Sequence, residues 1–134
     1  MTLMKGPAGS PYEEGLFLLD VCLPSEYPLK PPKITFRTPV FHCNVSANGF
    51  ICLDMLRNQW SPAMSVANCM QAILEMLKRP NSNDALRPAI AELYFAYRQS
   101  GGTDMRYIEQ AREATCADAS RSLEDWETSW GIGA

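Results

Sequence analysis

The sequence predicts an α+β domain in which a central helix packs across an antiparallel β-meander, with further helices in the C-terminal half. One change of apolar pattern along the chain, together with the size of the chain, leads to this expectation. The first forty residues hold short apolar runs of strand length separated by proline and glycine, whereas apolar residues after position 65 recur at helical spacing. The 134 residues, 46% of them hydrophobic, suffice for one domain with one core of ordinary size.

The first half predicts three strands. Residues 2–5 are a short strand candidate, and the glycine and proline of residues 6–11 predict a turn after it. Residues 15–23 are the second strand candidate, and they contain the uninterrupted apolar run Leu16 to Leu19. A proline-rich stretch at 24–32 ends that run and imposes extended backbone before a third strand at 33–37, where apolar and polar residues alternate.

The second half predicts three helices. Ser65 is the expected N-cap of the core helix, which ends before Pro80. Pro88 suits the first turn of a second helix, and Thr103 is expected to cap a third. The expected apolar stripes are Val66, Cys69, Met70, Ile73 and Leu77, then Ile90, Leu93, Tyr94 and Tyr97, then Met105, Ile108, Ala111 and Thr115.

We expect residues 1–119 to form the domain and residues 120–134 to form a mainly polar tail. Trp126 and Trp130 stand one helical turn apart in that tail. Two interpretations stay open: the tryptophans fold back over apolar surface or dock a partner, or the tail is disordered.

The charge and apolar patterns exclude several classes of function. The net charge is −3 and no basic run exceeds Lys78-Arg79, so a nucleic-acid partner is not expected. No apolar run is long enough to cross a membrane, and Met1 is not followed by a targeting pattern. Five cysteines without regular spacing indicate free thiols in a reducing compartment, so we expect a soluble protein of the cytoplasm, the nucleus or both.

A metal site is not expected either. His42, Cys43 and Cys52 lie close together in the sequence, but no CxxC or HxxxH spacing occurs. His42 is also the only histidine of the chain, so the sequence does not favour a structural zinc site.

Cys52 is the candidate nucleophile. It follows a turn through Asn48-Gly49, and Asn44 precedes that turn. A thiol at the mouth of a turn, near an amide that can donate to a developing oxyanion, is equipped for acyl transfer through a thioester. Taken alone, a cysteine between two apolar residues is more often a small buried side chain, and Asn44 and Asp84 are more often turn residues that bond their own backbone.

The order of motifs over residues 2–115 resembles the ubiquitin-conjugating enzyme family, and among its members the ubiquitin class. These carriers take ubiquitin from an activating enzyme and pass it on, usually with a ligase. Carriers of ubiquitin-like modifiers remain an alternative. The matching residues are Gly6-Pro7, Tyr12, Gly15-x-Phe17, Tyr27-Pro28-Leu29-Lys30-Pro31-Pro32-Lys33, His42-x-Asn44, Asn48-Gly49-x-Ile51-Cys52-Leu53-Asp54, Trp60-Ser61-Pro62-Ala63 and Pro80-Asn81.

The resemblance implies a role for each residue near Cys52. Cys52 forms the thioester, and Asn44 stabilises the oxyanion or the loop around it. His42 orders the turn without acting as a base. Asp84 matches the acidic position that helps to position or deprotonate the incoming lysine.

The resemblance also implies a surface for the ligase. Leu29 in the first proline-rich loop and Ser61, Pro62 and Ala63 in the second match the loops through which the family contacts ligases. The alternative is that these prolines only stiffen the loops. The implied partners are ubiquitin, the activating enzyme, a ligase and substrate lysines, and no cofactor is implied.

The implied activity is a thioester transfer, in which the Cys52 thiolate takes ubiquitin from the activating enzyme and a lysine then receives it. The alternative is a noncatalytic module of the same fold that binds ubiquitin or a ligase. Modules of that kind generally lack the cysteine, so the presence of Cys52 favours the enzyme.

Two features depart from the family pattern. Cys43 stands where the family usually has proline, which loosens the turn and adds a thiol that either modulates oxidation of Cys52 or simply replaces the proline. Members also begin with an amphipathic helix and a first strand, whereas this sequence starts inside what resembles the second strand, and we expect an exposed sheet edge there.

Overall fold

A computed structural model describes residues 1–129 of the chain, and its sheet is a three-stranded antiparallel meander in the order β1-β2-β3. The strands are β1 (Thr2–Lys5), β2 (Leu16–Cys22) and β3 (Lys33–Phe36). Leu19 of the central strand pairs with Thr2 on one side and with Phe36 on the other. The predicted meander is therefore confirmed, with strand ends within one residue of those expected.

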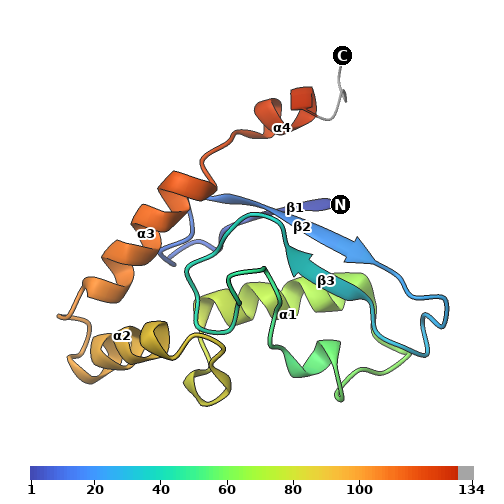
Figure 1. Cartoon of the computed structure of the whole chain (residues 1–134), viewed down its shortest axis with the longest axis horizontal. Coiled ribbons are helices and arrows are strands. Elements are labelled where there is room, and N and C mark those ends of the chain that lie inside the picture. Colours follow the sequence, from blue (N-terminus) through green and yellow to red (C-terminus); the bar gives the residue numbers. More distant parts are fainter. Residues whose placement is uncertain (130–134) are drawn as a thin grey trace.

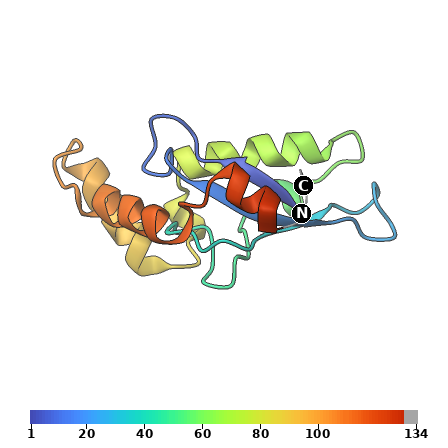
Figure 2. The same cartoon turned by 90° about the horizontal axis from the view of Figure 1, so that it is seen from above.

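The helix α1 (Val66–Lys78) covers one face of this sheet, as Figures 1 and 2 show from two directions. Alternate residues of β2 face it, and Phe17 and Leu19 have no exposed surface. Cys69 and Ile73 of α1 are equally enclosed, so the predicted apolar stripe forms the main core. Burying side chains of this size stabilises the fold by about 1.5–3 kcal/mol each.

The start of α1 agrees with the sequence. The Ser65 hydroxyl accepts the N–H of Asn68 at 3.1 Å, and the Asn68 side chain accepts the N–H of Ser65 at 2.8 Å. This reciprocal pair is a capping box, which satisfies two of the N–H groups that a helix start leaves without partners.

The helices α2 (Pro88–Gln99) and α3 (Arg106–Asp118) lie together at one end of the sheet (Figure 1). Pro88 occupies the first turn of α2, as predicted. Tyr107 of α3 is buried, and its hydroxyl lies 3.1 Å from the hydroxyl of Tyr12. The Tyr12 hydroxyl donates to the carbonyl of Phe41 at 2.5 Å. A second apolar cluster forms here, made of Cys43, Ile90, Ala91, Tyr107 and Ile108.

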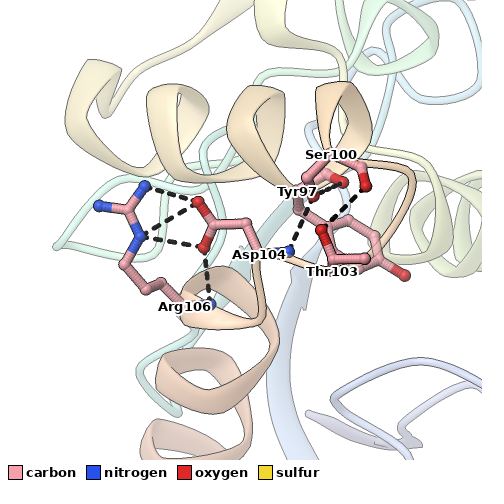
Figure 3. A network of polar contacts seen from close by, with 5 residues as sticks. All are labelled: Tyr97, Ser100, Thr103, Asp104 and Arg106. Atoms are coloured by element: carbon pink, nitrogen blue, oxygen red, sulfur yellow. Dashed lines mark hydrogen bonds and ion pairs between the residues drawn. The ribbon is translucent and has the colours of Figure 1, made fainter.

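The predicted start of α3 is wrong. Thr103 does not cap the helix; its hydroxyl donates to the carbonyl of Ser100 at 3.0 Å, and α3 begins three residues later without a side-chain cap. Asp104 instead receives the Arg106 guanidinium in a bidentate pair, with the shorter contact at 2.7 Å (Figure 3). This pairing holds the pKa of Asp104 below its usual value. Met105 is 36% exposed, so the buried stripe begins at Tyr107.

The short helix α4 (Leu123–Ser129) follows α3, on the side of the sheet where β1 lies (Figures 1 and 2). The Arg121 guanidinium stacks over the Trp126 ring at 3.9 Å from the ring centre, a cation–π contact local to the tail. Trp130 lies outside the described residues. In the described part of the chain no helix combines the length and the apolar character needed to cross a membrane.

A long irregular segment runs from residue 37 to residue 65 between the sheet and α1, interrupted by the short 3₁₀ helix η1 (Asp54–Leu56). A second 3₁₀ helix, η2 (Ser82–Asp84), stands in the connection from α1 to α2. His42, Asn44, Cys52 and residues 61–63 lie in the first stretch and Asp84 lies in η2, whereas Leu29 lies in the connection between β2 and β3.

Candidate active site

A narrow turn brings Cys52 beside Asn44. The N–H of Cys52 donates to the carbonyl of Asn44 at 2.9 Å. Gly49 stands in the turn with φ of +89°, and a Cβ at this position would lie 1.9 Å from the main-chain oxygen of Phe36. Only glycine fits there, because the backbone conformation and the close approach both exclude a side chain. The turn therefore fixes the main chain of Cys52 against that of Asn44.

The side chain of Asn44 is fully enclosed and holds the loop at 81–84. Its Nδ2 group donates to the carbonyls of Asn81 at 2.8 Å and Asp84 at 3.2 Å, and its Oδ1 accepts the N–H of Asn81 at 2.8 Å. Both amide hydrogens are thus in use. Of the two roles that the resemblance implies for Asn44, this geometry supports loop ordering, because an oxyanion would have to displace one of these carbonyls.

His42 is buried with both ring nitrogens engaged. Nδ1 accepts the N–H of Asn44 at 3.0 Å and therefore carries no proton, so Nε2 donates to the carbonyl of Met76 at 2.8 Å. Pro80 lacks the N–H that would otherwise meet this carbonyl in the helix. Burial lowers the pKa of His42 to about 4. A neutral imidazole in this position orders the turn and has no free nitrogen to act as a base.

Cys52 is partly exposed on an open groove of about 500 Å³, which we call the Cys52 groove. One Nη2 hydrogen of Arg57 points to the sulfur at an N–S distance of 3.5 Å, and the same nitrogen lies 3.1 Å from Asp54. The groove is lined by Asn44, Cys52, Leu53, Asp54, Met55, Ala72, Glu75, Met76, Arg79, Asn81 and Asp84. Cys52 therefore lines an open groove, and its sulfur contacts a cationic donor.

Asp84 lies on the exposed surface of η2, on the wall of the groove formed by the 79–84 segment. Its carboxylate accepts the side-chain amide of Asn81 at 3.2 Å, while Asn44 holds its carbonyl. The structure thus brings Cys52, Asn44 and Asp84 to one groove, from segments more than thirty residues apart in the chain.

The two loops with the predicted ligase contacts lie side by side. The Trp60 indole N–H donates to the carbonyl of Pro28 at 2.9 Å, and the Tyr27 and Trp60 rings lie 6.0 Å apart. Leu29 is 76% exposed next to this contact. Residues 61–63 directly follow Trp60, and Pro62 and Ala63 are exposed. One continuous surface therefore carries both predicted contact segments.

Cys43, in contrast, is sealed. Only 1% of it is exposed, its thiol donates weakly to Asn44 Oδ1 at 3.6 Å, and burial raises its pKa. This environment supports the interpretation of Cys43 as a passive replacement for proline. Across residues 1–129, no three side chains of the His, Cys, Asp and Glu types gather into a set that could hold a metal ion.

Two residues of the site had no role in the sequence analysis. Asn81 bonds Asn44 through its main chain, and its side chain accepts the N–H of Asn83 at 3.1 Å. The Pro80-Asn81 motif was its only signal. Arg57 stands three residues after Asp54, a spacing that favours an ion pair, but its contact with Cys52 depends on the turn of η1.

Comparisons with known proteins agree with this fold and site. The sequence model of the ubiquitin-conjugating enzyme family matches residues 1–107. The Arabidopsis thaliana protein named probable ubiquitin-conjugating enzyme E2 31 is 39% identical over 118 residues, which make up 88% of this chain and 73% of that protein.

Solved structures give the same result. A Toxoplasma gondii ubiquitin-conjugating enzyme E2 domain matches at 34% identity with a TM-score of 0.76, over 87% of this chain and 77% of that one. A Plasmodium yoelii protein named "putative ubiquitin conjugating enzyme" matches at 35% identity with a TM-score of 0.77, over 90% of this chain and 75% of that one. The domain therefore has the UBC-like α+β fold. The chain belongs to the ubiquitin-conjugating enzyme family.

Proposed function

We propose that this protein is a ubiquitin-conjugating transferase that accepts ubiquitin from an activating enzyme as a thioester on Cys52 and transfers it to a lysine, usually with a ligase. The observation that carries the proposal is the partly exposed Cys52, which lines a groove that Asn44 and Asp84 help to form. Cys43 and Cys69 are buried, so they do not offer an alternative nucleophile.

Each step exchanges one acyl bond for another. The Cys52 thiolate attacks the carbonyl carbon of the thioester on the activating enzyme, and that enzyme's cysteine leaves as a thiolate. In the second step a neutral lysine amine attacks the same carbonyl, loses a proton to a nearby base, and releases the Cys52 thiolate. Arg57 is placed to donate to this sulfur whenever it is anionic.

Asp84 and Asn44 have separate roles in the transfer to lysine. Asp84 stands on the groove wall, where an incoming ammonium is attracted and loses its proton to a carboxylate or to water. Asn44 holds the main chain on both sides of η2, so it fixes the position from which Asp84 meets the amine. We also propose that the surface around Leu29 and residues 61–63 receives the ligase.

Charging with activating enzyme, ATP and ubiquitin, analysed on nonreducing and reducing gels, tests the proposal. We expect a conjugate that reducing agent removes, and Cys52→Ser should give at most an oxyester that resists it. Cys116→Ser and Cys22→Ser are matched controls, because both thiols are exposed and neither lines the groove. A thiol-sensitive conjugate on Cys52→Ser would overturn the assignment.

The same assay separates the alternatives. Charging with a ubiquitin-like modifier but not with ubiquitin would reassign the carrier class. A folded protein that binds ubiquitin or a ligase and never charges would be the noncatalytic module instead.

We further propose that the protein acts in the cytoplasm, the nucleus or both, where its five cysteines stay reduced. Imaging of a fluorescent fusion of the full chain checks this, and retention in a secretory compartment would contradict it.

A further inference from the structure

A second hollow lies across the 79–84 segment from the Cys52 groove. It has a volume of about 320 Å³ and combines this segment with one face of α2. Asn81 and Asp84 line the groove, whereas Pro80 and Ser82 line the hollow, and Arg79 lines both. The segment is therefore a ridge between two depressions. The hollow is lined by Arg79, Pro80, Ser82, Tyr94, Phe95 and Arg98.

The hollow combines an exposed aromatic ring with two cations. Phe95 is 58% exposed, which is unusual for a side chain of this size on a helix that also packs a core. Arg79 and Arg98 are exposed, and neither forms an ion pair with a carboxylate of residues 1–129. No Asp or Glu is among the lining residues. On a chain of net charge −3, this is a local basic and apolar patch.

We infer that this hollow docks an acidic segment of the protein substrate, with carboxylates on Arg79 and Arg98 and an apolar side chain against Phe95. Arginine suits this role because its planar fork can bind a carboxylate through two hydrogen bonds. The exposed Phe95 ring supplies an apolar contact in addition to the two charges, so an acidic segment that also carries an apolar side chain fits the hollow. The inference rests on the proposed function and names the class of substrate that the site accepts.

The ridge explains why docking here affects the reaction. A peptide that contacts Arg79 is already at the border of the Cys52 groove, because Arg79 lines both depressions. An extended chain advances about 3.3 Å per residue, so a lysine a few residues away from the acidic segment can cross the ridge and enter the groove. Substrates with lysine followed or preceded by acidic and apolar residues are therefore favoured over neutral ones.

Binding is tested first, without any transfer. The probe is a fluorescein-labelled twelve-residue peptide that carries one lysine and, four residues away, the sequence Glu-Leu-Asp-Glu; its counterpart has Gln-Leu-Asn-Gln. We expect fluorescence anisotropy to show binding of the acidic peptide alone, weakened by added salt. Arg98→Glu should weaken it roughly fivefold or more, and Phe95→Ala roughly threefold, as for exposed ion pairs and partly buried rings.

Arg112→Glu is the matched control. It makes the same change of charge at an exposed position of α3 that does not line the hollow, and it should leave binding unchanged. Circular dichroism and thermal melting of each variant exclude misfolding. Equal binding of the two peptides, or equal effects of Arg98→Glu and Arg112→Glu, would overturn the inference.

Transfer is then measured on the preformed thioester, with free lysine and with the two peptides as acceptors. We expect faster discharge to the acidic peptide, a loss of this preference in Arg98→Glu, and unchanged discharge to free lysine. Normal charging without any preference between the peptides would refute the docking role and leave the proposed function intact. Failure of the wild-type protein to charge would refute the proposed function, while the anisotropy result would still decide the docking.

Discussion

Replacing Asn44 with alanine separates a structural role of this side chain from a chemical one. The substitution removes three hydrogen bonds between the enclosed amide and the main chain of Asn81 and Asp84. If Asn44 serves mainly to hold this loop, the variant should lose stability as well as transfer rate. A residue that only donates to an oxyanion would affect transfer alone.

The size of the expected loss follows from these contacts. Each hydrogen bond contributes about 0.5–1.5 kcal/mol net. The partners lie on an exposed loop where water can replace part of the lost bonding, so we expect about 2–3 kcal/mol in the free energy of unfolding. For a chain of this length, that corresponds to a fall in Tm of roughly 6–10 °C.

Urea unfolding and thermal melting of the uncharged protein measure this loss, and discharge of the thioester to free lysine measures the reaction. Asn83→Ala is the control, because Asn83 is exposed on the same loop and its side chain makes no hydrogen bond in the described structure. An Asn44→Ala variant that melts within about 1 °C of the wild type, yet discharges more than tenfold slower, would refute the structural role and favour oxyanion donation.

Three further perturbations have calculable outcomes. The pKa of His42 is about 4 in the folded protein, against an ordinary value of 6.5, so its contribution to stability is complete above pH 6.5 and is lost as the pH falls towards 4. The loss amounts to about 3 kcal/mol in the free energy of unfolding. Urea titrations at pH 7 and pH 4.5 should show this loss in the wild type and not in His42→Gln. Gly49→Ala should destabilise the protein by more than about 3 kcal/mol, because the added Cβ meets a main-chain oxygen. Gly9→Ala has a similar positive φ but open space around the added Cβ, so it should cost only about 1 kcal/mol. Equal urea midpoints for the two variants would contradict this. Trp60→Phe removes the hydrogen bond to Pro28 and should cost about 1 kcal/mol, with faster proteolysis of both loops than in the wild type; unchanged cleavage would show that the bond does not hold them together.

Local patterns in the sequence determine most of the fold. The meander follows from strand-length apolar runs between prolines and glycines, and α1 follows from its helical stripe and from Ser65. The start of α3 was predicted wrongly because Thr103 and Asp104 are both acceptable cap residues by type. The bidentate pair with Arg106 favours the later start, and sequence spacing alone does not reveal it.

The site was only partly predictable, for a physical reason. Cys52, Asn44 and Asp84 were identified as candidates from motifs, and the structure places all three on one groove. The partners of the Asn44 amide are main-chain atoms 37 and 40 residues away. Because nearly every residue carries the same main-chain groups, the residue types do not reveal which of them Asn44 binds. The contact between Trp60 and Pro28 was missed for the same reason.

The His42 imidazole donates to a carbonyl of α1 in place of the main-chain N–H that normally meets such a carbonyl in a helix. Because Pro80 brings no N–H to the carbonyl of Met76, His42 completes the last turn from outside, and its other nitrogen receives the amide hydrogen of Asn44. Because one side chain bonds both segments, we expect fraying of the helix end and loosening of the hairpin that carries Cys52 to occur together, with a shared rate of amide hydrogen exchange. The final turn of α1 and the hairpin that carries Cys52 are thus joined through one buried side chain.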